Sequence, residues 1–192
     1  MFRKPVSLGA GALAAMVLCG WLPVTAYGCG YDPDPAVGLT IAHPSSVAVA
    51  MAISDAVDAG RLQPRPELPA QLALMWANGA TRKFSVALGP ILDAGTLPPM
   101  TLLLVEPRLW SRIAPGPGGT RFEFHVNGPA SGDVVLVTGE SVLRELLDGR
   151  ISWQSAVATG IAVLDGPADQ RGEIARTLTQ RFPGSQPELA SR

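Results

Sequence analysis

The sequence predicts an α+β fold, in which a single domain packs an antiparallel sheet of about four or five strands against helices. Short apolar runs of strand length occur at 100–105 and 134–137. Residues 121–127 alternate between apolar and polar side chains, which is typical of a strand with one buried face. Apolar residues at helical spacing precede and follow these strands, and glycines mark the helix ends.

The first half of the predicted domain is helical. A helix should begin at Ser45 and end at Gly60, because serine caps and glycine stops are favoured at those positions. A proline-rich connector follows at 61–69, and a second helix is expected at about 69–77, ended by Asn78 and Gly79. Residues 80–95 fit either a strand or a continued helix, and we favour the helix.

The second half combines strands and helices. Pro107 interrupts the run at 100–105, and Leu109-Trp110 would extend it. A loop at 115–119 leads to the alternating strand, and Asn127–Asp133 turns into the buried strand at 134–137. The next helix would be capped by Thr138 or Ser141 and ended by Gly149.

The last elements are short. Ser152 should cap a helix that carries Trp153 and Ala156 and stops at Gly160. A strand at 161–164 and a final helix at 168–182 complete the domain. The helices around 140–160 and 168–182 should cover one side of the sheet, with the N-terminal helices packed nearby. The predicted core comprises Phe122, Phe124, Val135, Leu143, Leu146, Leu147, Val163 and Ile174.

This order of elements resembles the C-terminal half of the sterol-carrier-protein (type two) family, as an exported bacterial variant. The matching residues are Asp133 with the run 134–137, Leu146, Leu147, Gly149, Ala156, Gly160 and Gly166. The resemblance covers residues 98–182 and is best over 120–168. It implies a small α/β module with a hydrophobic pocket and no reaction.

Residues 1–28 have the composition of a bacterial secretory signal peptide. Arg3 and Lys4 precede an apolar stretch at 6–24, and the small residues Thr25, Ala26 and Gly28 follow it. A retained membrane anchor is the alternative, although the glycines and the proline in this stretch are unusual for a spanning helix. We therefore expect an exported, periplasmic protein.

Cys29 would be the only cysteine left after the signal peptide is removed. A lone cysteine at this place predicts either acylation of Cys29, which would anchor the protein to the membrane, or ordinary cleavage after Ala26 or Gly28. Residues 29–44 should then form a flexible arm, residues 45–182 the single domain and residues 183–192 a tail.

The charge argues against a nucleic-acid partner. The segment 1–28 contains two basic and no acidic residues, so its removal takes the formal net charge from −1 to −3. A mildly acidic chain without a basic cluster does not favour binding to a phosphate backbone.

The residues with catalytic potential are few. The sequence contains two histidines, His43 and His125, far apart and without the paired spacing of a zinc site. No nucleotide-binding, haem-attachment or hydrolase motif occurs. We therefore expect no enzyme activity, no cofactor and no metal.

The function that this pattern and the resemblance suggest is non-catalytic binding of a lipid-like or other apolar small molecule in the bacterial cell envelope. The alternative is a structural or accessory protein that binds another envelope protein and has no ligand pocket. The side chains expected to line a pocket are Trp110, Phe122, Phe124, Leu143, Leu147, Trp153, Ala156 and Gly160.

Overall fold

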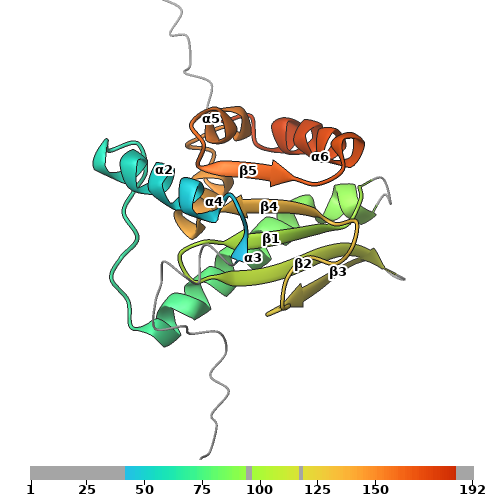
Figure 1. Ribbon diagram of the computed structural model, residues 1–192, viewed down its shortest axis with the longest axis horizontal. Helices are drawn as coiled ribbons and strands as arrows, with labels where there is room; N and C mark the ends of the chain where they lie inside the picture. Colours follow the sequence, from blue (N-terminus) through green and yellow to red (C-terminus); the bar gives the residue numbers. More distant parts are fainter. Residues whose placement is uncertain (1–41, 94–96, 117–118, 185–192) are drawn as a thin grey trace, which may run out of the picture. The chain divides into compact units, whose positions relative to one another are not determined.

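The computed structural model describes residues 42–93, 97–116 and 119–184. All of them lie in one compact unit, Asp32–Arg192 (Figure 1). The predicted signal peptide, Cys29 and most of the arm at 29–44 lie outside the described residues, as do residues 185–192 of the tail.

A five-stranded sheet with the order β3-β2-β1-β4-β5 forms the centre of the unit. The predicted α+β class and number of strands are confirmed, but the sheet is mixed rather than wholly antiparallel. β1 (Met100–Leu104) and β4 (Val134–Thr138) pair in parallel, while the other neighbouring pairs are antiparallel. The parallel pair arises because the chain completes a meander on one side of β1 and then crosses to its other side.

That meander contains a strand boundary that the sequence interpretation placed wrongly. Leu109 and Trp110 do not extend β1 but begin β2 (Leu109–Gly116), which runs back along β1. The backbone reverses at Arg108, whose φ of 50° lies in the left-handed region. β3 (Gly119–Phe124) then pairs with β2 and ends before His125, another residue with positive φ.

The predicted helix at 45–60 is α2 (Ser46–Asp58), and the second helix is longer than predicted. α3 (Ala70–Asp93) continues through Asn78 and Gly79, so the break expected there is wrong, whereas the helical interpretation of 80–95 holds as far as Asp93. The helix continues because its inner face stays buried through this region, at Ala77, Ala80, Thr81, Phe84 and Leu88.

α4 (Glu140–Leu147) lacks the predicted cap from Thr138 or Ser141. Its N-cap is Gly139, which has no side chain that could accept a hydrogen bond from the helix. The hydroxyl of Thr138 donates instead to the backbone carbonyl of Ile161, at 2.9 Å, and so is not available to the helix.

The remaining elements agree closely with the sequence interpretation. α5 (Trp153–Ala158) begins at Ser152, whose hydroxyl accepts a hydrogen bond from the backbone N–H of Ser155 as predicted. β5 (Ala162–Asp165) and α6 (Ala168–Arg181) follow. Ile174 and Leu178 of α6 are buried.

Helices cover the sheet on both faces rather than on one. Figure 1 shows α2 in front of the sheet and α3 behind it, and every residue of β1 and β4 is buried. Of the predicted core residues, Val135, Leu143, Leu146 and Ile174 are buried, whereas Phe122, Phe124, Leu147 and Val163 are half-buried. The two phenylalanines are less buried than predicted because β3 is an edge strand.

Candidate functional site

The aromatic residues predicted to line a pocket lie on opposite faces of the sheet. Phe122 pairs with Ile113 and Phe124 with Ser111, so the two rings share one face, where they are 4.1 Å apart at an angle of 74°. Trp110 lies next to Ser111 in β2, and successive side chains of a strand point to opposite faces, so Trp110 points to the other face. These three side chains consequently do not meet around one cavity.

The candidate residues of the helical segment 140–160 are closely packed. Leu143, Trp153 and Ala156 are buried, and Leu147 is half-buried. A Cβ placed on Gly160 would lie 3.7 Å from the Cβ of Ala52 in α2, which is an ordinary van der Waals distance. The small residues of this segment thus allow helices to approach each other.

An apolar cavity lies elsewhere, between α3, the start of β1 and α6. Its volume is about 10 Å³, which is room for the centre of one water-sized molecule. The predicted pocket residues are not among those that line it, which are Leu88, Leu97, Pro98, Met100, Ile174, Thr177 and Leu178.

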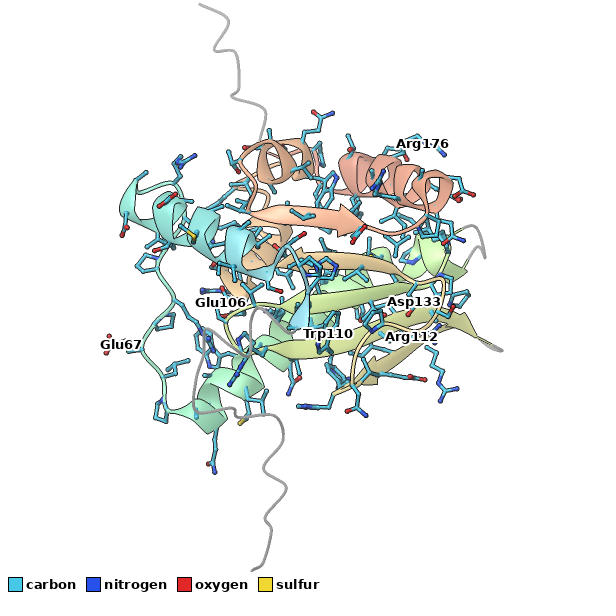
Figure 2. All side chains as sticks on the ribbon, in the orientation of Figure 1. Glu67, Glu106, Trp110, Arg112, Asp133 and Arg176 are labelled. Atoms are coloured by element: carbon cyan, nitrogen blue, oxygen red, sulfur yellow. The ribbon has the colours of Figure 1, made fainter. Side chains whose placement is uncertain are left out.

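Two glutamates meet at the end of the sheet where the parallel strands finish. Leu104 and Thr138 pair as the last residues of β1 and β4, and Glu106 and Glu140 each follow two positions later. Figure 2 shows Glu106 at this end of the sheet. The carboxyl ends of parallel strands are where α/β sheets commonly place functional groups.

Two arginines pair with the buried Glu140, one from its own helix α4 and one from the connector before α3. Its Oε1 lies 2.9 Å from Nε of Arg144, and its Oε2 lies 3.4 Å from Nε of Arg65 in the connector. Neither carboxylate oxygen has a well-aligned hydrogen-bond donor among the described residues, so the attraction is mainly coulombic. The guanidinium carbon of Arg144 also lies 6.0 Å from the ring centre of Trp76 in α3.

Glu106 takes the place of a capping side chain for α4. Its Oε2 accepts a hydrogen bond from the backbone N–H of Glu140, at 3.1 Å. The absence of a side chain at Gly139 makes this approach possible, because a Cβ there would lie 2.5 Å from Oε1 of Glu106. Neighbouring protein atoms shield the carboxyl group from water and so raise the pKa of Glu106, against the opposing effect of this hydrogen bond and of Arg65, although the residue as a whole is exposed.

The raised pKa of Glu106 predicts a measurable pH dependence of folding. The folded protein holds the Glu106 proton more tightly than the unfolded chain, so stability from this group falls as the pH rises from its ordinary pKa of 4.5 through the raised value. Glu106→Gln keeps an oxygen that can accept from Glu140 but removes the charge. We expect the variant to lose less stability than the wild type in urea unfolding as the pH rises above 4.5, by a small margin because Glu106 is exposed to water. Parallel stability–pH curves for the two proteins would contradict this role.

A second buried carboxylate, Asp133, lies at the opposite end of β4 (Figure 2). It accepts hydrogen bonds from Nε and Nη2 of Arg112, at 2.8 and 3.0 Å, and from the hydroxyl of Thr101, at 2.6 Å. The backbone N–H of Ala130 donates a further bond. With its oxygens occupied by three segments of its own chain, Asp133 has a structural role.

Within 42–93, 97–116 and 119–184, no group of three or more His, Cys, Asp or Glu side chains is placed to hold a metal ion. Four charged residues form what we call the charged centre, which joins the segment before α3, the start of α4 and the end of β1: Arg65, Glu106, Glu140 and Arg144. Its residues could not be selected from the sequence, because their proximity depends on the parallel pairing of β1 and β4.

Comparisons with known proteins give likenesses among solved structures. No protein-family model and no curated protein matches the chain. A solution structure of a conserved hypothetical protein from Thermus thermophilus, described as a possible sterol carrier protein, is similar with 19% identity and a TM-score of 0.31. The match covers 59% of this chain and 89% of that one. These values are too low to carry a functional argument, so the resemblance to sterol-carrier proteins stays a prediction.

Proposed function

We propose that the protein binds a lipid-like or other apolar small molecule without catalysing a reaction. The observation that supports this is the apolar seam beneath α6, where Leu88 of α3, Met100 of β1 and Leu178 of α6 surround a cavity. Apolar cavities bordered by several elements are the usual setting of lipid-sized ligands.

The cavity is too small for such a ligand as it stands, since a drug-sized molecule needs about 300 Å³ or more. Binding therefore requires α6 to move away from α3. The attachment of α6 is suited to this, because Ile174 and Leu178 are its fully buried side chains. Beyond them, Nε of Arg181 donates to the carbonyl of Ala87 at 2.8 Å, and the ring of Phe182 stacks on Phe84 at 5.6 Å.

The proposal places this activity in the bacterial cell envelope. The basic and apolar composition of residues 1–28 supports export, and Cys29 supports attachment to the membrane by acylation. Native mass spectrometry of the protein purified from its own envelope tests both parts. We expect a polypeptide that lacks residues 1–26 or 1–28 and carries a dissociable lipid-like adduct. A full-length polypeptide would contradict export, and the absence of any adduct would count against ligand binding.

A pair of substitutions on α6 tests the position of the ligand. Thr177 is half-buried and lines the cavity, whereas Arg176 beside it is exposed and points outward in Figure 2. Thr177→Phe should fill the seam and weaken the uptake of a fluorescent fatty acid by about tenfold, because it removes the space for the acyl chain. Arg176→Phe adds the same ring on the solvent side and should leave uptake unchanged. Equal uptake by both variants would exclude the seam as the site.

The second candidate function is that of an accessory protein that binds another envelope protein. The small size of the cavity favours it, because a filled core leaves the surface as the place for recognition. If the wild-type protein shows no saturable binding of any apolar probe, that result would support this second function.

A further inference from the structure

The outer face of α3 exposes four large apolar side chains, three near the start of the helix and one at Val86, with Gly79, Arg82 and Lys83 exposed between them. It comprises Leu72, Met75, Trp76, Lys83 and Val86, which lie within one side of the helix at spacings of three, four and seven residues. The apolar side chains among them are largely exposed: Leu72 is 46% exposed, Met75 66%, Trp76 48% and Val86 70%. From Leu72 to Val86 this face extends for about 20 Å.

The inner face of the same helix is also apolar, since Ala77, Phe84 and Leu88 are buried in the core. A surface helix normally presents polar residues opposite its buried stripe, whereas a helix that is apolar all round is covered on both sides. α3 departs from the usual pattern of a surface helix, because four large apolar side chains lie exposed on its outer face among polar ones. This indicates a partner that covers the outer face.

The charges of α3 indicate the chemistry of that partner. The helix contains two basic residues, Arg82 and Lys83, and one acidic residue, Asp93, at its C-terminal end. Lys83 lies on the outer face, and exposed Arg82 lies at its edge, with its guanidinium carbon 5.3 Å from the ring centre of Phe124. A cationic, apolar face complements a surface that combines hydrocarbon with negative charge.

The arrangement at Trp76 fits the same partner. Its ring is half-exposed and lies over Arg144, which is itself held by Glu140 of α4. Tryptophan is favoured at the boundary between lipid head groups and hydrocarbon, because it combines a large apolar ring with a hydrogen-bond donor.

We propose that the outer face of α3 binds the surface of a lipid bilayer that contains anionic head groups. The helix lies parallel to the surface, with Met75, Trp76 and Val86 inserted and Lys83 beside the phosphates. No described helix is long and apolar enough to cross a membrane, which agrees with peripheral binding by this element. The inference is independent of a ligand beneath α6.

The test is co-sedimentation of the full chain with vesicles of phosphatidylcholine, with and without phosphatidylglycerol. Met75→Ser combined with Val86→Ser should lower the partition coefficient by about tenfold or more, since two exposed side chains lose their transfer into hydrocarbon. Lys83→Glu should lower binding by about fivefold to vesicles that contain phosphatidylglycerol and leave binding to phosphatidylcholine unchanged.

A matched control is available on α2, where Val47 and Met51 are 41% and 63% exposed. Val47→Ser with Met51→Ser removes the same two side-chain types, and every variant keeps the same N-terminus, so a contribution from residues 1–28 or Cys29 cancels. Binding that is unchanged in the α3 variant, or reduced equally in the α2 control, overturns the proposal. A change in self-association on sizing columns, without a change in vesicle binding, would also overturn it and assign the face to a second copy of the chain.

Discussion

Replacing Leu146 by alanine should destabilise the protein by about 2–5 kcal/mol. Leu146 is 2% exposed and belongs to the buried stripe of α4, together with Val142 and Leu143. The cost has two parts, because the variant loses the transfer free energy of the removed atoms and also leaves a cavity that the neighbours fill incompletely. α4 has eight residues, so tertiary packing rather than intrinsic helix stability keeps it folded.

Urea unfolding of Leu146→Ala measures this effect, and the adjacent residue provides the control. Leu147 undergoes the same chemical change in Leu147→Ala, but it is half-buried, so we expect a clearly smaller loss of unfolding free energy. If the two variants lose the same free energy, or Leu146→Ala loses none, the face assigned to α4 is wrong.

Local patterns predicted the elements well where the signal lay within one element. The apolar run at 134–137 and the serine cap at Ser152 led to the correct structure, and the alternation at 121–127 predicted β3, although that strand ends at Phe124. Such signals need no knowledge of distant partners, because periodicity and capping depend on neighbouring residues.

The errors arose where tertiary contacts overrode local preference. Gly79 predicts a helix stop, but it lies exposed in α3 while Ala77 and Ala80 on either side stay buried. The cost of a glycine inside a helix is about 1 kcal/mol, which the packing of a long buried face can exceed. The cap of α4 was missed for a similar reason, because Glu106 precedes Glu140 by 34 residues.

The position of a candidate site was harder to predict than the fold. Trp110 and Phe124 look equivalent as aromatic residues of predicted strands, yet the pairing of β2 with β1 and β3 places them on opposite faces. A shift of one residue in register reverses the face, and register is not visible in a single strand. The charged centre and the seam beneath α6 likewise combine residues that only the assembled sheet brings together.

The pair of Asp133 and Arg112 depends on register in the same way, and its removal should have a large effect. Asp133→Ala leaves the buried hydroxyl of Thr101 and the guanidinium of Arg112 without their common acceptor. We expect a loss of about 2–3 kcal/mol at neutral pH, below the cost for a fully buried pair because 26% of the Arg112 side chain is exposed to water.

The pH dependence of this loss separates the charge of Asp133 from its packing. Burial opposes ionisation, but the hydrogen bonds from Arg112 and Thr101 outweigh it and hold the pKa of Asp133 below its ordinary value of 3.8. The carboxylate therefore stabilises the folded state above the ordinary pKa, and this stabilisation disappears as the pH falls through the lowered value. The difference in unfolding free energy between wild type and Asp133→Ala should shrink correspondingly in acid.

An exposed ion pair of the same length is the control for Asp133→Ala. Oδ2 of Asp148 lies 2.8 Å from Nη2 of Arg150, the same distance as between Oδ2 of Asp133 and Nε of Arg112. Because the exposed pair exchanges its partners for water and counterions, Asp148→Ala should change the unfolding free energy by no more than the experimental error. Two results would contradict this role of Asp133. One is a similar loss of unfolding free energy in the two variants, and the other is a loss in Asp133→Ala that stays the same in acid. Either would show that the hydrogen bonds of the Asp133 carboxylate do not stabilise the contact between β1, β2 and β4.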